Sequence, residues 1–138
     1  MALAVAAATV TYLTVPLTVD VICTEADLVE DEVCLQTVLE EWKGENVVWV
    51  DARGREQFTK QAVPGAVLIN MDPQENFDEL VAEAVEQLAM ADRVVVYCGA
   101  SSCKASKQIV ASLKETGLVA EAFALYGGVK ALKRAELF

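Results

Sequence analysis

An apolar run that ends in a cysteine is the feature that most constrains how this chain can fold. Residues 94–97, Val-Val-Val-Tyr, predict a buried strand with Cys98 at its carboxyl end. The residues that follow the cysteine are small: they are Gly99, Ala100, Ser101, Ser102 and Cys103. Apolar side chains at positions 105, 109 and 113 then predict a helix. A strand, a loop of small residues and a helix are typical of α/β domains, which place their ligand sites at the carboxyl ends of strands.

Cys98 is the candidate nucleophile of this stretch. The backbone N–H groups of a small-residue loop and of the first turn of a helix can point toward one anion, and the helix adds a partial positive charge. Such a field favours the thiolate, which is the reactive form of cysteine. The alternative interpretation is a buried, unreactive residue, because free cysteine is among the most buried residue types.

Length and charge exclude several classes of protein. The chain has 138 residues, of which 54% are hydrophobic, so it can build one domain with a core of its own. Its formal net charge of −10 argues against binding to the phosphate backbone of nucleic acids. It contains no histidine, which excludes Ser-His-Asp triads, Cys-His dyads and histidine metal sites. Cys98 is therefore activated by backbone groups and cations or not at all.

The four cysteines suit neither a disulfide scaffold nor a zinc knuckle. They are few and unevenly spaced for a chain of this size, and none forms a C-x-x-C pair. Cys98 and Cys103 are separated by four residues, so Cys103 is a possible resolving thiol if the loop curls. The other interpretation of Cys103 is a small buried residue at the start of the helix.

Two segments precede the domain that we expect at residues 33–138. Residues 1–19 carry no charge, and they either reach a membrane as a marginal anchor or pack on the domain or on another copy. Residues 20–32 are acidic and predict a solvated connector. The compartment, either cytoplasmic or membrane-anchored, and the oligomeric state stay open at this point.

Strands and helices alternate through the rest of the chain. The predicted strands are residues 47–50, 66–69, 94–98 and 120–125. The predicted helices cover residues 35–42, 55–60, 77–88 and 105–113 and the stretch after Gly128, and a turn is expected at residues 63–65. This alternation predicts an α/β domain on a mostly parallel sheet.

Several short motifs resemble those of the rhodanese sulfurtransferases. They are Val50-Asp51-Ala52-Arg53, Arg55-Glu56-Gln57-Phe58, Val63-Pro64-Gly65-Ala66, Val95-Val96-Tyr97-Cys98 with Ser106, and Leu125-Tyr126-Gly127-Gly128. They occur in the family's order and at its spacing, from about residue 33 to the end of the chain. The resemblance implies a central, mostly parallel five-stranded sheet with helices on both faces.

The resemblance also implies a persulfide mechanism at Cys98. The cysteine would take the outer sulfur of a donor such as thiosulfate, release sulfite and hold the sulfur as a persulfide. A thiol or protein acceptor would then remove it. No metal or cofactor is implied, and the partners are a small sulfur-containing anion and that acceptor.

The resemblance assigns supporting roles to neighbouring residues. Asp51 is interpreted as a structural acceptor for backbone N–H groups or for Arg53, and not as a general base. Arg55 and Lys104 either supply positive charge for a dianionic donor or are solvated surface cations. The loop residues from Gly99 to Lys104 form the expected substrate-binding loop, in which Ser101 and Ser102 either donate hydrogen bonds or are present because they are small.

The sequence departs from the family at two places and leaves two other functions open. Gln61-Ala62 replace the usual Gly-His before the turn, and Val129 and Leu132 follow the glycine pair without the usual tryptophan. One alternative function is a binding or redox-sensing module that uses Cys98 and Cys103. The other is a phosphatase or arsenate reductase, which Lys104 disfavours because such loops end in an arginine that binds the oxyanion in a bidentate manner.

Overall fold

The computed structural model of the chain describes residues 23–99 and 104–138. The predicted segment at residues 1–19 and four residues of the predicted loop, Ala100, Ser101, Ser102 and Cys103, lie outside the described residues. In the described part of the chain, no helix is both long and apolar enough to span a bilayer.

The strands of the described residues form one parallel sheet. They are β1 (Glu32–Val33), β2 (Val47–Asp51), β3 (Val67–Leu68), β4 (Arg93–Tyr97) and β5 (Ala122–Leu125), and their order across the sheet is β1-β5-β4-β2-β3. Every pair is parallel. The predicted five-stranded α/β fold is therefore confirmed, with β4 as the central strand.

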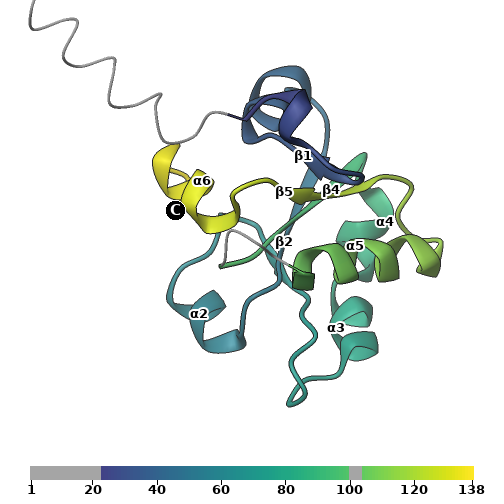
Figure 1. Cartoon of the computed structure of the whole chain (residues 1–138). Helices are drawn as coiled ribbons and strands as arrows, with labels where there is room; N and C mark the ends of the chain where they lie inside the picture. Colours follow the sequence, from purple (N-terminus) through teal and green to yellow (C-terminus); the bar gives the residue numbers. More distant parts are fainter. Residues whose placement is uncertain (1–22, 100–103) are drawn as a thin grey trace, which may run out of the picture.

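The helical elements alternate with these strands (Figure 1). They are η1 (Glu25–Asp27), a 3-10 turn; η2 (Thr37–Glu41), a π-helical segment; and the α-helices α2 (Arg55–Lys60), α3 (Phe77–Glu83), α4 (Val85–Met90), α5 (Lys104–Thr116) and α6 (Gly128–Arg134). Helix α2 has the predicted bounds. Gly44 and Gly117 follow η2 and α5 with positive φ angles of 92° and 77°, so both act as the predicted stops.

Side chains of the central strands alternate between two cores. Val94 and Val96 of β4 face a core that includes residues of α3, α4 and α5. Val95 and Tyr97 of the same strand face a second core, which is closed by η2 and α6. Helices therefore cover both faces of the sheet, and both cores pack against the strand that leads to Cys98.

The structure differs from the predicted elements in several places. The predicted helix at residues 77–88 is divided into α3 and α4 at Ala84, whose φ and ψ of −102° and 8° are not helical. The predicted strands at residues 66–69 and 120–125 are shorter, as β3 and β5. Strand β1 was not predicted, because two residues are too few to show a period in the sequence.

Candidate active site

Cys98 directly follows the central strand, as its place in the sequence predicts. Its side chain is 4% exposed and packs in the core that also contains α5. Its carbonyl oxygen accepts a hydrogen bond of 2.9 Å from the N–H of Val129, which fixes the cysteine backbone to the start of α6. Cys98 is disulfide-bonded, so its sulfur must be reduced before it can act as a nucleophile.

Loops from neighbouring strands meet at the carboxyl edge of the sheet around Cys98. The N–H of Ala52, after β2, donates to the carbonyl of Tyr97 at 2.9 Å. Gly99 lies against Arg53, because a Cβ added to Gly99 would stand 3.6 Å from Arg53 Cδ. The chain thus brings Cys98 and Gly99 together with the predicted supporting residues Asp51 and Arg53. Ala100, Ser101, Ser102 and Cys103 cannot be placed, since they lie outside the described residues.

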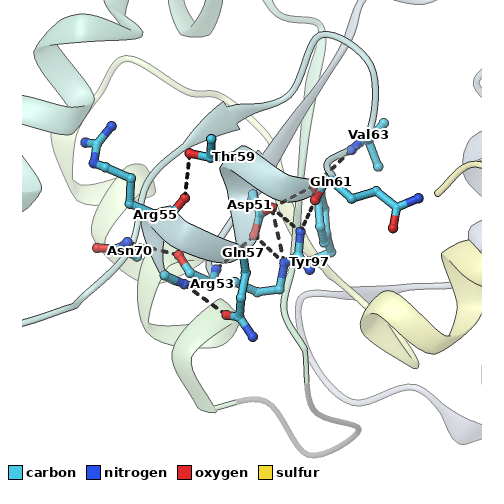
Figure 2. Close-up of polar contacts among 10 residues, drawn as sticks. Asp51, Arg53, Arg55, Gln57, Thr59, Gln61, Val63, Asn70 and Tyr97 are labelled. Atoms are coloured by element: carbon cyan, nitrogen blue, oxygen red, sulfur yellow. Dashed lines mark hydrogen bonds and ion pairs between the residues drawn. The ribbon is translucent and has the colours of Figure 1, made fainter.

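Asp51 is the centre of a buried polar network, which Figure 2 shows. Its side chain is fully buried. Asp51 Oδ1 accepts hydrogen bonds from the backbone N–H of Arg53 at 2.9 Å and from Arg53 Nε at 3.0 Å, and Oδ2 accepts from the Arg53 terminal nitrogen at 2.8 Å. This arrangement agrees with the predicted role of Asp51 as an acceptor for Arg53 and for backbone N–H groups.

The same network engages Nε and one terminal nitrogen of Arg53. Its guanidinium also donates to the carbonyl of Gln61 at 2.5 Å and lies 4.6 Å from the ring centre of Phe138. The hydrogen bond to Asp51 raises the pKa of Arg53 above its usual value. Arg53 is therefore a positioning residue, since its charge is directed at Asp51 and the loop rather than at an open site.

Tyr97 completes the network from β4 (Figure 2). Its hydroxyl donates to Asp51 Oδ2 at 3.0 Å and accepts from the N–H of Val63 at 3.1 Å. Burial raises the pKa of Tyr97 above its usual range, so the hydroxyl stays protonated and remains a donor. The bond to Val63 holds the turn at residues 63–66, which forms despite the replacement of the family's Gly-His by Gln61-Ala62.

The two candidate cations have different environments. Arg55 donates two hydrogen bonds of 2.9 Å to the carboxylate of Glu75, so its charge is already balanced. Lys104 is exposed at the first residue of α5 and follows the loop after Cys98. Of the two, Lys104 is the closer to Cys98 in the sequence. Within residues 23–99 and 104–138, no cluster of His, Cys, Asp or Glu could hold a metal ion.

Sequence reasoning missed three contributors to this edge of the sheet. The sequence pattern places Tyr97 in an apolar strand, and the signal for its polar role is that a buried tyrosine hydroxyl needs a hydrogen-bond partner. Asn70, which is buried, donates from its side-chain amide to the carbonyl of Arg53 at 2.9 Å. The third is a disulfide between Cys23 and Cys34. Cys34 is the residue directly after β1.

Comparison with known proteins identifies the family. The family model of the rhodanese-like domain matches residues 35–135, which is most of the chain. The chain belongs to the rhodanese-like domain family. No curated protein matches it significantly.

Solved structures with the rhodanese-like fold are similar to this chain at low identity. A thiosulfate sulfurtransferase from Pseudomonas aeruginosa is 23% identical with a TM-score of 0.57, and the match covers 85% of this chain but 23% of that one. A rhodanese-like domain from Anabaena is 23% identical with a TM-score of 0.54, over 78% and 76% of the two chains. A protein from Lactobacillus plantarum is 22% identical with a TM-score of 0.56, over 77% and 84%. At these identities the likeness shows the fold alone.

The rhodanese-like fold accommodates the second departure from the family. Val129 and Leu132 stand where the family's tryptophan is expected, and both are buried in the core that η2 and α6 close. Tyr126, just before the glycine pair, is partly exposed and supplies an aromatic side chain at this edge. The departure therefore changes the rim of the site and leaves the position of Cys98 intact.

Proposed function

We propose that this rhodanese-like domain is a sulfurtransferase that uses Cys98 as its nucleophile. The observation that carries the proposal is the place of Cys98, at the carboxyl end of the central strand and next to the Asp51–Arg53 pair. The family supports the same reaction class. The donor is a small sulfur-containing anion such as thiosulfate, and the acceptor is a thiol.

The reaction consists of two displacements at sulfur. The Cys98 thiolate attacks the sulfane sulfur of thiosulfate, the S–S bond of the donor breaks, and sulfite leaves with the electron pair. The enzyme then carries a persulfide. An acceptor thiolate attacks the outer sulfur of that persulfide and returns Cys98 as a thiolate, so no external oxidant or reductant is consumed in the cycle.

The chain activates Cys98 without histidine. The positive end of α5 and the charge of Lys104 follow the cysteine, and both favour a thiolate or a persulfide anion over the neutral form. The network of Asp51, Arg53 and Tyr97 acts on Cys98 indirectly. Its hydrogen bonds fix the loop after β2 against β4, the strand that leads to the cysteine. Their role is to hold the edge of the sheet on which the anion would bind.

The disulfide state of Cys98 favours a second candidate function, a redox module. Cys23 and Cys34 pair with each other, and Cys98 is also disulfide-bonded. In this second function Cys103 is the resolving thiol, and a dithiol reductant would transfer two electrons to the pair.

Mass spectrometry of the intact protein separates the two functions. The protein is reduced, desalted and incubated with thiosulfate, as wild type and as Cys98→Ser and Cys103→Ser. We expect a mass gain of one sulfur atom in the wild type and in Cys103→Ser, and none in Cys98→Ser. A loss of two hydrogens that needs both cysteines, without any gain of sulfur, would instead establish the redox module.

A charge substitution on α5 tests how the donor binds. Lys104→Gln should raise the thiosulfate concentration that gives half-maximal persulfide by about two- to fivefold, because an exposed charge contact contributes about 0.5–1 kcal/mol. Lys107→Gln is the matched control, since Lys107 is exposed on the same helix and pairs with Glu32. Equal effects of the two substitutions would show only a general loss of positive charge.

A further inference from the structure

The Cys23–Cys34 disulfide joins two parts of the molecule with very different burial. Cys34 is 4% exposed and follows β1, which pairs with β5. Cys23 is only partly buried, and none of residues 24–31 is buried. The 11-residue separation of the two cysteines therefore encloses an exposed segment, which contains η1. We call residues 23–31 the stapled segment.

The other contacts of the stapled segment gather at its end near β1. The carbonyl of Asp31 accepts from the N–H of Ala124 at 2.7 Å, and its carboxylate pairs with Lys114. The N–H of Val29 donates to the carboxylate of Glu32 at 2.8 Å. Around η1, the side chain of Asp27 bonds within the segment, to Thr24. Among the contacts of residues 23–99 and 104–138, the disulfide is therefore the principal tie at the η1 end.

A pocket borders Cys23, the less buried cysteine of this disulfide. The pocket has a volume of about 290 Å³ and is lined by Cys23, by Leu35 and Leu39, and by Tyr126 from the loop after β5. The N–H of Tyr126 donates to the carbonyl of Val33 at 2.9 Å, so this wall of the pocket is fixed to the sheet. A small thiol in the pocket can reach the Cys23 side, whereas the Cys34 side is covered.

We propose that the Cys23–Cys34 disulfide is a thiol-exchange site that opens at Cys23 and releases the stapled segment. A thiolate of a dithiol reductant attacks Cys23 Sγ, the Cys23–Cys34 bond breaks, and Cys34 leaves as a thiolate that takes up a proton. The second thiol of the reductant then attacks the mixed disulfide and frees Cys23. The reductant becomes a disulfide, and the protein gains two electrons and two protons.

The consequence of reduction is local. Strand β1 stays paired with β5, and Leu35 and Val38 stay in the core, because none of these contacts depends on the disulfide. The η1 end loses its principal tie and moves away from the pocket that Cys23 lines. Reduction therefore widens the pocket beside Tyr126 while the sheet that carries Cys98 is unchanged.

Hydrogen exchange on a two-cysteine protein tests the proposal independently of any chemistry at Cys98. The Cys98→Ser/Cys103→Ser chain keeps only Cys23 and Cys34. Reduction with dithiothreitol should raise amide exchange in residues 24–30 by about tenfold, with β4 and α5 unchanged. The chain that also carries Cys23→Ser and Cys34→Ser should show the same fast exchange without any reductant.

Several results would overturn the proposal. Alkylation of both cysteines before reduction would show that the bond does not form. Unchanged exchange in residues 24–30 after reduction would show that the disulfide holds nothing in place, and faster exchange in β4 would show that the effect is not local. Peptide mapping after brief treatment with glutathione should find the mixed disulfide on Cys23, and an adduct on Cys34 would refute the assigned point of attack.

Discussion

The Asp51–Arg53–Tyr97 network and the stapled segment are held in place by opposite means. Asp51 is fully buried and receives hydrogen bonds from the backbone and side chain of Arg53 and from the Tyr97 hydroxyl, so several contacts support one another. In the stapled segment none of residues 24–31 is buried, and one covalent bond, between Cys23 and Cys34, holds its η1 end. The network should therefore open only when the whole domain unfolds, whereas the stapled segment should unfold locally while the sheet stays folded.

The network should show the largest effect when its central carboxylate is neutralised. In Asp51→Asn, the amide keeps the shape of the side chain but removes the charge that pairs with Arg53, whose side chain is 10% exposed. We expect a loss of about 3–5 kcal/mol in the free energy of unfolding, because one partner of a buried ion pair is removed. Urea denaturation followed by circular dichroism measures it.

A control for Asp51→Asn comes from an exposed ion pair. Glu56 pairs with Lys60 one turn along α2, and both side chains are at least three-quarters exposed. Glu56→Gln should leave the unfolding midpoint unchanged within error. If Asp51→Asn proved as mild as Glu56→Gln, the network would not hold the edge of the sheet, and the contrast with the stapled segment would disappear.

Tyr97→Phe tests the neutral member of the network, and its effect on the free energy of unfolding should depend on pH. The change leaves the N–H of Val63 without its acceptor and Asp51 without one donor, which should cost about 2 kcal/mol at neutral pH. Burial raises the pKa of Tyr97 in the folded state above its value in the unfolded chain. The hydroxyl therefore contributes its full stabilisation at pH values below the pKa of the unfolded tyrosine, and this contribution is lost as the pH rises above it.

The alkaline range separates the tyrosine from other groups. Above about pH 10 the unfolded tyrosine is ionised while the folded one is not, so the wild type should lose about 1.4 kcal/mol per pH unit more than Tyr97→Phe. Denaturation curves at several alkaline pH values measure this difference. Parallel pH dependence of the two proteins would mean that the hydroxyl is not buried in the network.

Local patterns predicted most of the fold, because they depend on neighbouring residues. The bounds of α2, the turn at Gly65 and the contact between Asp51 and Arg53 are all set within a few positions of the chain. Partners that are far apart in the sequence were missed. Tyr97 meets Val63 across 34 positions, and the Cys23–Cys34 bond requires β1 to add to the edge of β5. Cysteine connectivity does not follow from sequence alone.

Removal of the disulfide should have a smaller effect on stability than Asp51→Asn. For Cys23→Ser/Cys34→Ser we expect a loss of about 2 kcal/mol, at the low end for a native disulfide, because none of residues 24–31 is buried. Thermal unfolding measures the change. A loss as large as that of Asp51→Asn would mean that the stapled segment unfolds together with the sheet and not by itself.

The smallest effect should come from the ion pair at the other end of the stapled segment, and its size should depend on the disulfide. Asp31 and Lys114 are both partly exposed, so Lys114→Gln should cost about 0.5 kcal/mol in the disulfide-bonded protein. In the Cys23→Ser/Cys34→Ser protein, this pair is among the few remaining ties, and its removal should speed amide exchange in residues 24–30 further. The effects of Lys114→Gln and of removing the disulfide on the amide exchange rate of residues 24–30 should therefore be non-additive. Additive effects would show that the two ends of the segment are held independently.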